Sequence, residues 1–258
     1  MRGGKLVAVA AALVLAACQG EVQAPTAVER PPPAVAMRGV DLANDASDVL
    51  NELQTSRLNF VARYYRHPTS RWPALSRGEA QRLSSLGVNI VALWEWHSAD
   101  PAYFSYGSGY ADAVMASDQA RRVGQPKDTA IYFAVDFNAR GPALDAVRQY
   151  FRGVAAGLAA AGGGRPLYRA GVYGSGAVCD AVKRSGLAQY SWLSNSSAWS
   201  GSLGYNAWNI RQSGRFPSLS FSHDADEAKD DYGGFRITAA ASAAPTARPP
   251  DTVQAAAR

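Results

Sequence analysis

Hydrophobic and polar positions along the central part of the chain follow two periods in turn. Short runs rich in β-branched and aromatic residues recur, and most are followed by a longer segment with apolar residues at helical spacing. The clearest run spans residues 130–138, with the sequence AIYFAVDFN. Alternation places Asp136 and Asn138 on the face opposite Phe137. A run this short and apolar is typical of a buried strand, and here its last inward-facing residues are an acid and an amide.

The same alternation predicts five strand–helix units. The expected strands span residues 39–43, 59–66, 89–96, 130–138 and 169–174. The expected helices include a first one capped by Asn44 or Asp45, then residues 76–86, 110–123, 141–161 and 176–185. Ser76 and Glu79 are in capping-box register. Three more strands, at residues 191–194, 207–212 and 219–224, follow without a helical pattern between them.

This order of elements indicates the fold class. Strands that alternate with helices favour parallel βαβ packing, and about 200 residues suit one barrel. We therefore predict an α/β fold, a TIM-type barrel of the (β/α)5β3 variant with truncated outer helices after the fifth strand.

Composition and charge narrow the function classes. The chain of 258 residues is 47% hydrophobic, which suffices for one substantial core. Its formal net charge is +5, yet it contains no run of five or more Lys and Arg residues. A nucleic-acid partner is therefore not expected. We expect a monomer without a cofactor.

Both ends of the chain differ from the barrel region. Residues 1–17 combine a basic start with an apolar segment and small residues, the pattern of an export signal that is too short to span a membrane. Residues 18–38 are polar and Pro-rich, as in an extended tether. Residues 238–258 lack apolar periodicity and are predicted to be disordered. The barrel is expected at residues 39–237.

The end of the leader resembles a bacterial lipobox, Leu-Ala-Ala-Cys, which ends at Cys18. This resemblance implies cleavage before Cys18 and lipid attachment to its thiol, so that the exported protein is anchored to a membrane. An ordinary signal peptide cut near Ala17 or Ala24 is the alternative. In a diderm cell the expected location is the outer membrane or the periplasmic face, and Gln19 after the cysteine, in place of Asp, fits sorting to the outer membrane. Cys179 then has no disulfide partner and is predicted to be buried in a helix.

Carboxylates recur at the expected ends of the strands. In a parallel barrel these ends converge on the face where barrel enzymes carry their active sites. Several carboxylates at one mouth raise one another's pKa, so one can donate a proton while another stays ionised. The candidate catalytic residues are Asp41, Glu95, Asp136 and Asp224, although each could instead be a structural acid. Asp226 fits a loop or capping role better.

Aromatic side chains gather near the same ends. Aromatic planes pack well against the C–H faces of sugar rings, so acids and aromatics together favour a polysaccharide ligand, although half or more of these side chains could be core packing. The candidate substrate-binding residues are Asn138, Tyr65, Trp96, Tyr173, Trp192, Trp208, Gln212 and Asp226. Alternation directs Trp94 toward the helices.

Other motifs fit less well. The Gly-rich segment at residues 171–176 lacks the Lys-Ser/Thr of a P-loop, and Ser175 lacks the Gly-x-Ser-x-Gly context of an esterase nucleophile. His97 and His223 lie near predicted strand ends, where they could hold a divalent metal together with the carboxylates. A metal-assisted phosphodiesterase is therefore the alternative in another enzyme class, and no metal site is assigned.

The ordered set of motifs resembles a known family. Gly-Val-Asp-Leu-Ala at 39–43, Ile-Tyr-Phe-Ala-Val-Asp-Phe at 131–137, Gly-Val-Tyr-Gly at 171–174 and His-Asp-Ala-Asp-Glu-Ala at 223–228 resemble the glycoside-hydrolase-like family once catalogued as domain of unknown function 1906. That family is similar in fold to the family 25 lysozymes, whose barrel has five βα units followed by three strands. The resemblance implies a glycosidase that acts on a cell-envelope glycan, with peptidoglycan as the expected substrate.

The resemblance also implies roles for individual acids. The lysozyme acids on strands one, four and eight are matched by Asp41, Asp136 and Asp224, with Asp226 as second choice for the last. The lysozyme general acid, however, is matched by Asn138, which cannot donate a proton in that role. Either Glu95 supplies the acid, with Asp136 or Asp41 as base or stabiliser and Asn138 orienting an N-acetyl group, or the barrel binds glycan without cutting it.

Overall fold

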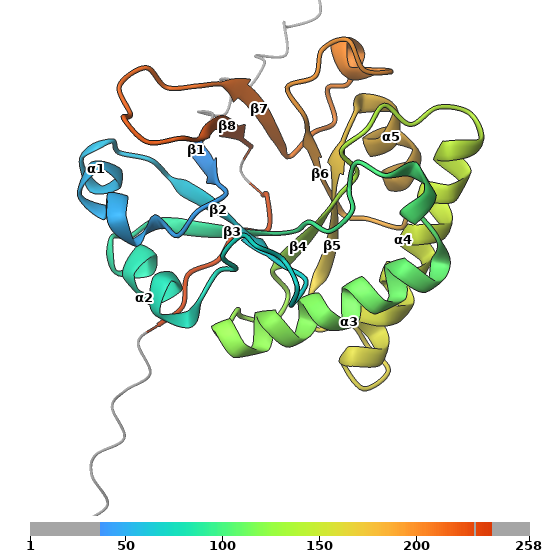
Figure 1. Ribbon diagram of the computed structural model, residues 1–258, viewed down its shortest axis with the longest axis horizontal. Coiled ribbons are helices and arrows are strands. Elements are labelled where there is room, and N and C mark those ends of the chain that lie inside the picture. Colours follow the sequence, from blue (N-terminus) through green and yellow to red (C-terminus); the bar gives the residue numbers. More distant parts are fainter. Residues whose placement is uncertain (1–36, 230, 239–258) are drawn as a thin grey trace, which may run out of the picture. The chain divides into compact units, whose positions relative to one another are not determined.

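The computed structural model describes residues 37–229 and 231–238. The expected export signal, Cys18, nearly all of the tether and all but one residue of the tail lie outside these ranges. The described residues form a closed barrel of eight strands in sequence order (Figure 1). The predicted α/β barrel is confirmed.

The elements follow the predicted alternation. The strands are β1 (Met37–Leu42), β2 (Phe60–Tyr65), β3 (Asn89–Trp94), β4 (Ala130–Ala134), β5 (Arg169–Gly174), β6 (Tyr190–Leu193), β7 (Ile210–Gly214) and β8 (Asp224–Ala228). The α-helices are α1 (Leu50–Thr55), α2 (Arg77–Ser85), α3 (Tyr106–Val123), α4 (Pro142–Ala161) and α5 (Gly176–Arg184). Short 3-10 helices lie at Ala46–Val49, Pro101–Tyr103 and Ser202–Gly204. Each of the first five strands is followed by an α-helix, and among the described residues none follows β6 or β7. None of the helices in the described ranges combines the length and the apolar character needed to cross a membrane.

The last strand departs from the prediction. β8 runs antiparallel to both of its neighbours, with Asp41 of β1 paired with Asp224, while β1 to β7 are parallel. The expected strand at residues 219–224 is wrong, because residues 219–223 form an irregular approach in which His223 Nε2 accepts a hydrogen bond from the Phe216 amide at 3.0 Å. The acids of β8 therefore lie at its beginning rather than after its end.

Apolar side chains form two layers, one inside the barrel and one between the strands and the helices. The inner layer includes Ala62, Leu93, Tyr132, Trp192 and Ile210, and all of these side chains are buried. The outer layer includes the alternate positions of the same strands, among them Phe133 and Trp94. The predicted orientation of Trp94 is thus confirmed, as is the burial of Cys179 in α5.

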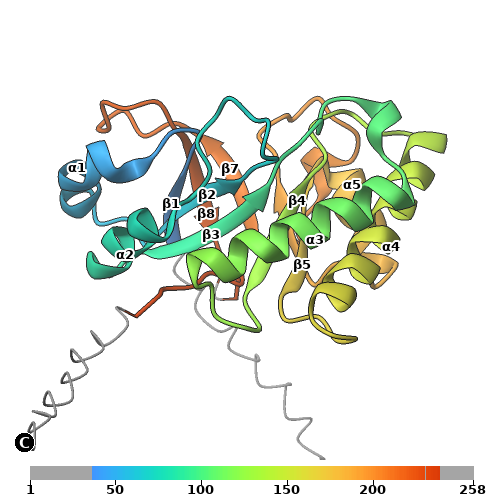
Figure 2. The ribbon, with the colours of Figure 1, turned by 60° about the horizontal axis from the view of Figure 1, so that its bottom comes forward.

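The helices α3 and α4 pack closely along one flank of the barrel (Figure 2). Glycines permit this approach: a Cβ at Gly153 would lie 2.0 Å from the carbonyl oxygen of Tyr106, and one at Gly109 would lie 2.0 Å from that of Tyr150. No other residue fits at such a contact without moving the helix backbones.

At the start of α2, Ser76 Oγ accepts a hydrogen bond from the amide of Glu79 at 3.1 Å. The expected capping box is only half formed, because the Glu79 carboxylate pairs instead with Arg63 of β2 and accepts from the Ala46 amide at 2.8 Å. Arg63 and Glu79 are both fully buried. This ion pair joins β2, α2 and the segment after β1.

Candidate active site

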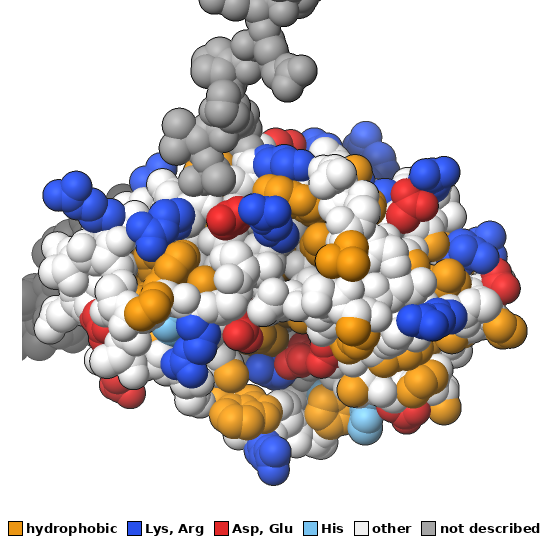
Figure 3. Space-filling model, turned by 90° about the horizontal axis from the view of Figure 1, so that it is seen from above, with side chains coloured by type: hydrophobic (Ala, Val, Ile, Leu, Met, Phe, Trp, Pro, Cys, Tyr) orange, Lys and Arg blue, Asp and Glu red, His pale blue; other side chains and the backbone are white. Residues whose placement is uncertain are grey.

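The inward positions of the strands become polar at one end of the barrel. Asp41, Glu95 and Asp136 occupy inward positions on or just after β1, β3 and β4. Asp224 and Asp226 reach the same end from β8 because of its antiparallel pairing with β1. Neighbouring carboxylates in this group lie close enough for each charge to affect the pKa of another. Figure 3 shows a hollow in which acidic and basic side chains gather between hydrophobic ones.

Asp41 has the most fully defined surroundings of these acids. It is 4% exposed, and its two oxygens accept hydrogen bonds from Tyr64 Oη at 2.7 Å and from Gln212 Nε2 at 2.9 Å. Burial raises the pKa of Asp41 to about 6, although the two hydrogen bonds act in the opposite direction. The charges of Asp224 and Glu95 raise this pKa further. Asp41 therefore changes its charge close to neutral pH.

Asp226 lies deeper than Asp41 and is fully buried. Its Oδ1 accepts a hydrogen bond from Trp192 Nε1 at 2.9 Å, whereas Oδ2 has no partner among the described residues if the group is ionised. Burial and the charge of Asp41 raise the pKa of Asp226 well above its usual range. A neutral Asp226 satisfies both oxygens, because its O–H can then donate to Asp41.

Glu95 lines a pocket of about 650 Å³, and Asp136 is hydrogen-bonded through its backbone to Ser98, another residue of the lining. Glu95 follows β3, is about one-third exposed and forms an ion pair with Arg66 Nη1. Asp136 is half-buried, and its carboxylate has no hydrogen bond to a described residue, although its amide donates to the Ser98 carbonyl at 2.8 Å. Burial, then the charge of Glu95, raises the pKa of Asp136. The two acids therefore differ in their partners. Glu95 is paired with a permanent cation, Arg66, whereas Asp136 has no cationic partner among the described residues.

Aromatic rings surround part of this pocket. Trp96 lines it and stacks on His67 with ring centroids 4.4 Å apart, and His97 packs edge-on against the same indole. Tyr173 lies across the mouth and donates to Gln212 Oε1 at 3.1 Å. Gln212 thereby connects Tyr173 with Asp41, which fixes the orientation of its amide group.

Three predicted binding residues do not reach the mouth. Tyr65 is fully buried on the outer face of β2, where its hydroxyl donates to Gln125 Oε1 at 2.8 Å. Trp192 is fully buried inside the barrel, where it contacts Asp226 instead of solvent. Trp208 precedes β7 and therefore lies at the opposite end, with Lys229 Nζ 4.0 Å from its ring centroid. The prediction that these side chains contact a ligand at the mouth is wrong.

Asn138 and Asp224, two further predicted site residues, differ in their surroundings. Asn138 Oδ1 accepts a hydrogen bond from the Ser200 amide at 2.9 Å, which ties the loop after β4 to the loop between β6 and β7. Only the NH₂ group of Asn138 therefore remains for a ligand. Asp224 is exposed at the rim, opposite Asp41 in the pairing of β1 with β8.

Sequence reasoning missed Arg66 and the role of Tyr64. Both share the inward orientation of Phe60 and Ala62, so strict alternation along β2 could have found them. The signal was ambiguous because the strand is buried on both faces, and Arg63 on the outer face is as polar as Arg66.

The histidines do not join the acids. His223 is held between the Phe216 amide and the Phe221 carbonyl, and His97 packs against Trp96 and Tyr103. Across residues 37–229 and 231–238, no group of three or more His, Cys, Asp and Glu side chains has the arrangement of a metal site.

A closed α/β barrel whose mouth collects carboxylates beside aromatic rings has the features expected of a glycoside hydrolase-like barrel. Residues 51–238 match the family described as "Rv2525c-like, glycoside hydrolase-like domain". The chain belongs to this family, so the family expected from the motifs is confirmed.

The chain is also similar to individual proteins, and the solved structures among them share its fold. The uncharacterised protein YbfG of Bacillus subtilis is 34% identical over 157 residues, which are 57% of this chain and 21% of YbfG. The chain thus spans about a fifth of the length of this curated relative. The crystal structure of the Mycobacterium tuberculosis Tat-secreted protein Rv2525c has a TM-score of 0.62 at 21% identity and covers 77% of this chain and 98% of that one. The modular autolysin LytC of Streptococcus pneumoniae has a TM-score of 0.51 at 10% identity, over 75% of this chain and 46% of that one.

Proposed function

We propose that this protein is an exported glycosidase that cleaves a cell-envelope glycan, peptidoglycan, at the barrel mouth. The observation that carries the proposal is the unequal environment of neighbouring acids. Glu95 is paired with Arg66, while Asp136 is half-buried without a hydrogen-bond partner among the described residues and has a raised pKa. Glycoside hydrolysis needs such a pair, one carboxyl group that holds a proton and one that stays ionised.

We assign the proton to Asp136 rather than to Glu95, because Glu95 is paired with Arg66 and the pKa of Asp136 is raised. Asp136 donates its proton to the glycosidic oxygen as the bond to the anomeric carbon breaks. Glu95, neutralised in part by Arg66, and Asp41 stabilise the positive charge that develops on the sugar. Water then adds to the anomeric carbon, and its proton returns to Asp136. Asp226 is a positioning residue, because it has no exposed surface and acts through Asp41.

The location and substrate are supported by the ends of the chain and by the relatives. Residues 1–17 have the composition of an export signal, and the lipobox-like sequence at Cys18 supports a membrane anchor. Rv2525c is described as Tat-secreted and LytC as an autolysin, and both share the barrel fold. An anchored glycosidase outside the cytoplasm would meet peptidoglycan first.

One experiment separates hydrolysis from binding alone. The purified protein is incubated with purified peptidoglycan, and released reducing ends are followed for the wild type, Asp136→Asn and Glu95→Gln. We expect release by the wild type and a loss of about 100-fold or more in both variants, with Asp145→Asn on the exposed face of α4 as the control. A wild type that sediments with the polymer but releases nothing would instead make the protein a glycan-binding barrel, a candidate favoured by Asn138 in place of an acid.

A further inference from the structure

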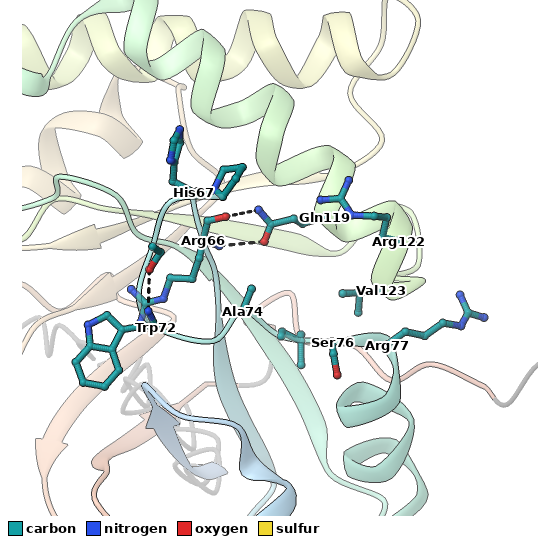
Figure 4. Close-up of a pocket in the computed structure, with 12 residues that line it drawn as sticks. Arg66, His67, Trp72, Ala74, Ser76, Arg77, Gln119, Arg122 and Val123 are labelled. Atoms are coloured by element: carbon teal, nitrogen blue, oxygen red, sulfur yellow. Dashed lines mark hydrogen bonds between the residues drawn. The ribbon is translucent and has the colours of Figure 1, made fainter.

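A second pocket of about 460 Å³ adjoins the acid mouth. It lies between the loop after β2, the first turn of α2 and the carboxyl-terminal half of α3 (Figure 4). Arg66, Ser70 and Trp72 line both this pocket and the one beside Glu95. The two hollows are therefore neighbouring parts of one groove.

The lining of the second pocket is basic. It includes Arg66, Arg77, Arg122 and His67, and it contains no carboxylate. Arg77 and Arg122 are exposed, and neither makes an ion pair or a hydrogen bond with another described residue. Next to Arg122 on α3, by contrast, Arg121 pairs with Asp118. The positive charges of Arg77 and Arg122 are thus left without a partner among the described residues.

Arg66 connects the pocket to the acids. It is 7% exposed, and its backbone is fixed by Gln119, whose Oε1 accepts from the Arg66 amide at 3.0 Å (Figure 4). Its Nη1 pairs with Glu95, but its buried Nε has no hydrogen-bond partner among the described residues. Buried guanidinium donors are usually satisfied, so Arg66 lacks part of its usual set of acceptors, and its guanidinium carbon lies 4.0 Å from the centroid of the Tyr64 ring.

One further feature favours an anion here. Arg77 is the first residue of α2, so the free amides and the positive end of a nine-residue helix border the pocket. The Arg77 guanidinium lies against Gly124, where a Cβ would be 2.9 Å from Nη1. The absence of a side chain at Gly124 therefore leaves room for the arginine over the end of α3.

We propose that this basic pocket binds an anionic group, a carboxylate or a phosphate ester, carried by the glycan that lies in the acid mouth. The arginines supply paired N–H donors that match either group. Trp72, 43% exposed between the two hollows, offers a face for the intervening sugar. The pocket makes the protein selective for anionic over neutral glycans. This inference rests on the proposed function only for the identity of the polymer and not for its cleavage.

The test is sedimentation of the protein with insoluble polymers, which does not depend on turnover. The variant is Arg77→Gln with Arg122→Gln, because a change at Arg66 would also disturb Glu95. Its matched control is Arg152→Gln with Arg165→Gln, which removes the same charge from exposed positions outside the pocket. The polymers are native peptidoglycan, peptidoglycan amidated at its carboxylates, peptidoglycan freed of phosphodiester-linked polymers by hydrofluoric acid, and neutral chitin.

We expect the pocket variant to bind native peptidoglycan about tenfold more weakly than the wild type, and the control pair to bind as the wild type does. If the anion is a carboxylate, amidation abolishes this difference; if it is a phosphate, acid treatment does so. Equal binding of native peptidoglycan by wild type and pocket variant overturns the proposal, as does an equal loss on chitin. Binding that follows the expected pattern without release of reducing ends refutes the glycosidase and leaves the pocket intact.

Discussion

Gln212 donates a hydrogen bond from Nε2 to Asp41 Oδ2 at 2.9 Å, while its Oε1 accepts from Tyr173 Oη at 3.1 Å. The second contact determines which end of the amide faces the acid. Gln212 therefore presents an N–H, not a carbonyl, to a buried carboxylate whose pKa is already raised to about 6. This arrangement keeps Asp41 ionised at a lower pH than burial alone would permit.

Gln212→Leu should raise the pKa of Asp41 above 6. A hydrogen bond to the charged form lowers a carboxyl pKa, so its removal should raise this pKa by about one unit. Titration of ¹³C-labelled aspartate carboxyl groups by NMR measures the shift directly. Gln54→Leu, at an exposed position on α1, is the control. An unchanged titration midpoint would show that the Gln212 hydrogen bond has little effect on Asp41.

Asp41→Asn should stabilise the fold at neutral pH. The folded-state pKa of Asp41 is raised from 3.8 to about 6, so the folded protein holds this proton more tightly than the unfolded chain does. The contribution of Asp41 to stability is thus fully present below pH 3.8 and is lost as the pH rises through about 6. The loss amounts to about 3 kcal/mol. Denaturant unfolding should show Asp41→Asn more stable than the wild type at pH 7 and close to it near pH 4. A stability difference that does not vary with pH would contradict this account.

Arg63→Met should destabilise the protein by about 3–5 kcal/mol, because it leaves the fully buried Glu79 without its cation. The double variant with Glu79→Met should recover part of this loss, since no unpaired charge remains. Arg184→Met, which breaks an exposed i,i+4 pair with Asp180, should change stability by less than about 0.5 kcal/mol. Urea midpoints measure all three. Equal effects of Arg63→Met and Arg184→Met would mean that the buried pair contributes no more than a surface pair.

Gly153→Ala should separate α3 from α4. The added Cβ would lie 2.0 Å from the Tyr106 carbonyl oxygen, and neither helix backbone can move without disturbing the outer core layer. We expect a loss of about 3 kcal/mol or more. Gly204→Ala has no atom within 4 Å of the new Cβ and is the matched control. A thermal midpoint for Gly153→Ala equal to that of Gly204→Ala would show that the helices tolerate a wider spacing.

The position of Asp136 and Glu95 at the mouth could be predicted from the sequence, because each follows an apolar strand. Asp136 ends an apolar run with clear alternation, and Glu95 follows another, so both the strand end and the inward face could be read from the pattern. Tyr65 shows where this method fails. Parallel barrel strands are buried on both faces, so a tyrosine on either face gives the same local signal.

The local sequence pattern also does not show how deeply a side chain lies in the barrel or in which direction a strand runs. Trp192 lies within β6 and Trp208 just before β7, but only the arrangement of the strands in the barrel shows that one is inside it and the other is at its far end. The direction of β8 is set by its pairing with β1. The paired residues are separated in sequence by nearly the whole barrel. An acidic strand such as Asp224–Ala228 also has few residues of high β propensity.

The antiparallel β8 has a consequence for how the chain folds. Asp41 and Asp226 come together only when the last strand joins the first, a contact between distant parts of the sequence that costs loop-closure entropy and slows folding. The step that closes the barrel is therefore also the step that forces two acids into one buried site. Both acids are ionised in the open chain at neutral pH, so closure must either bring two charges together or take up a proton, and the final stage of folding should be faster in mild acid than at neutral pH.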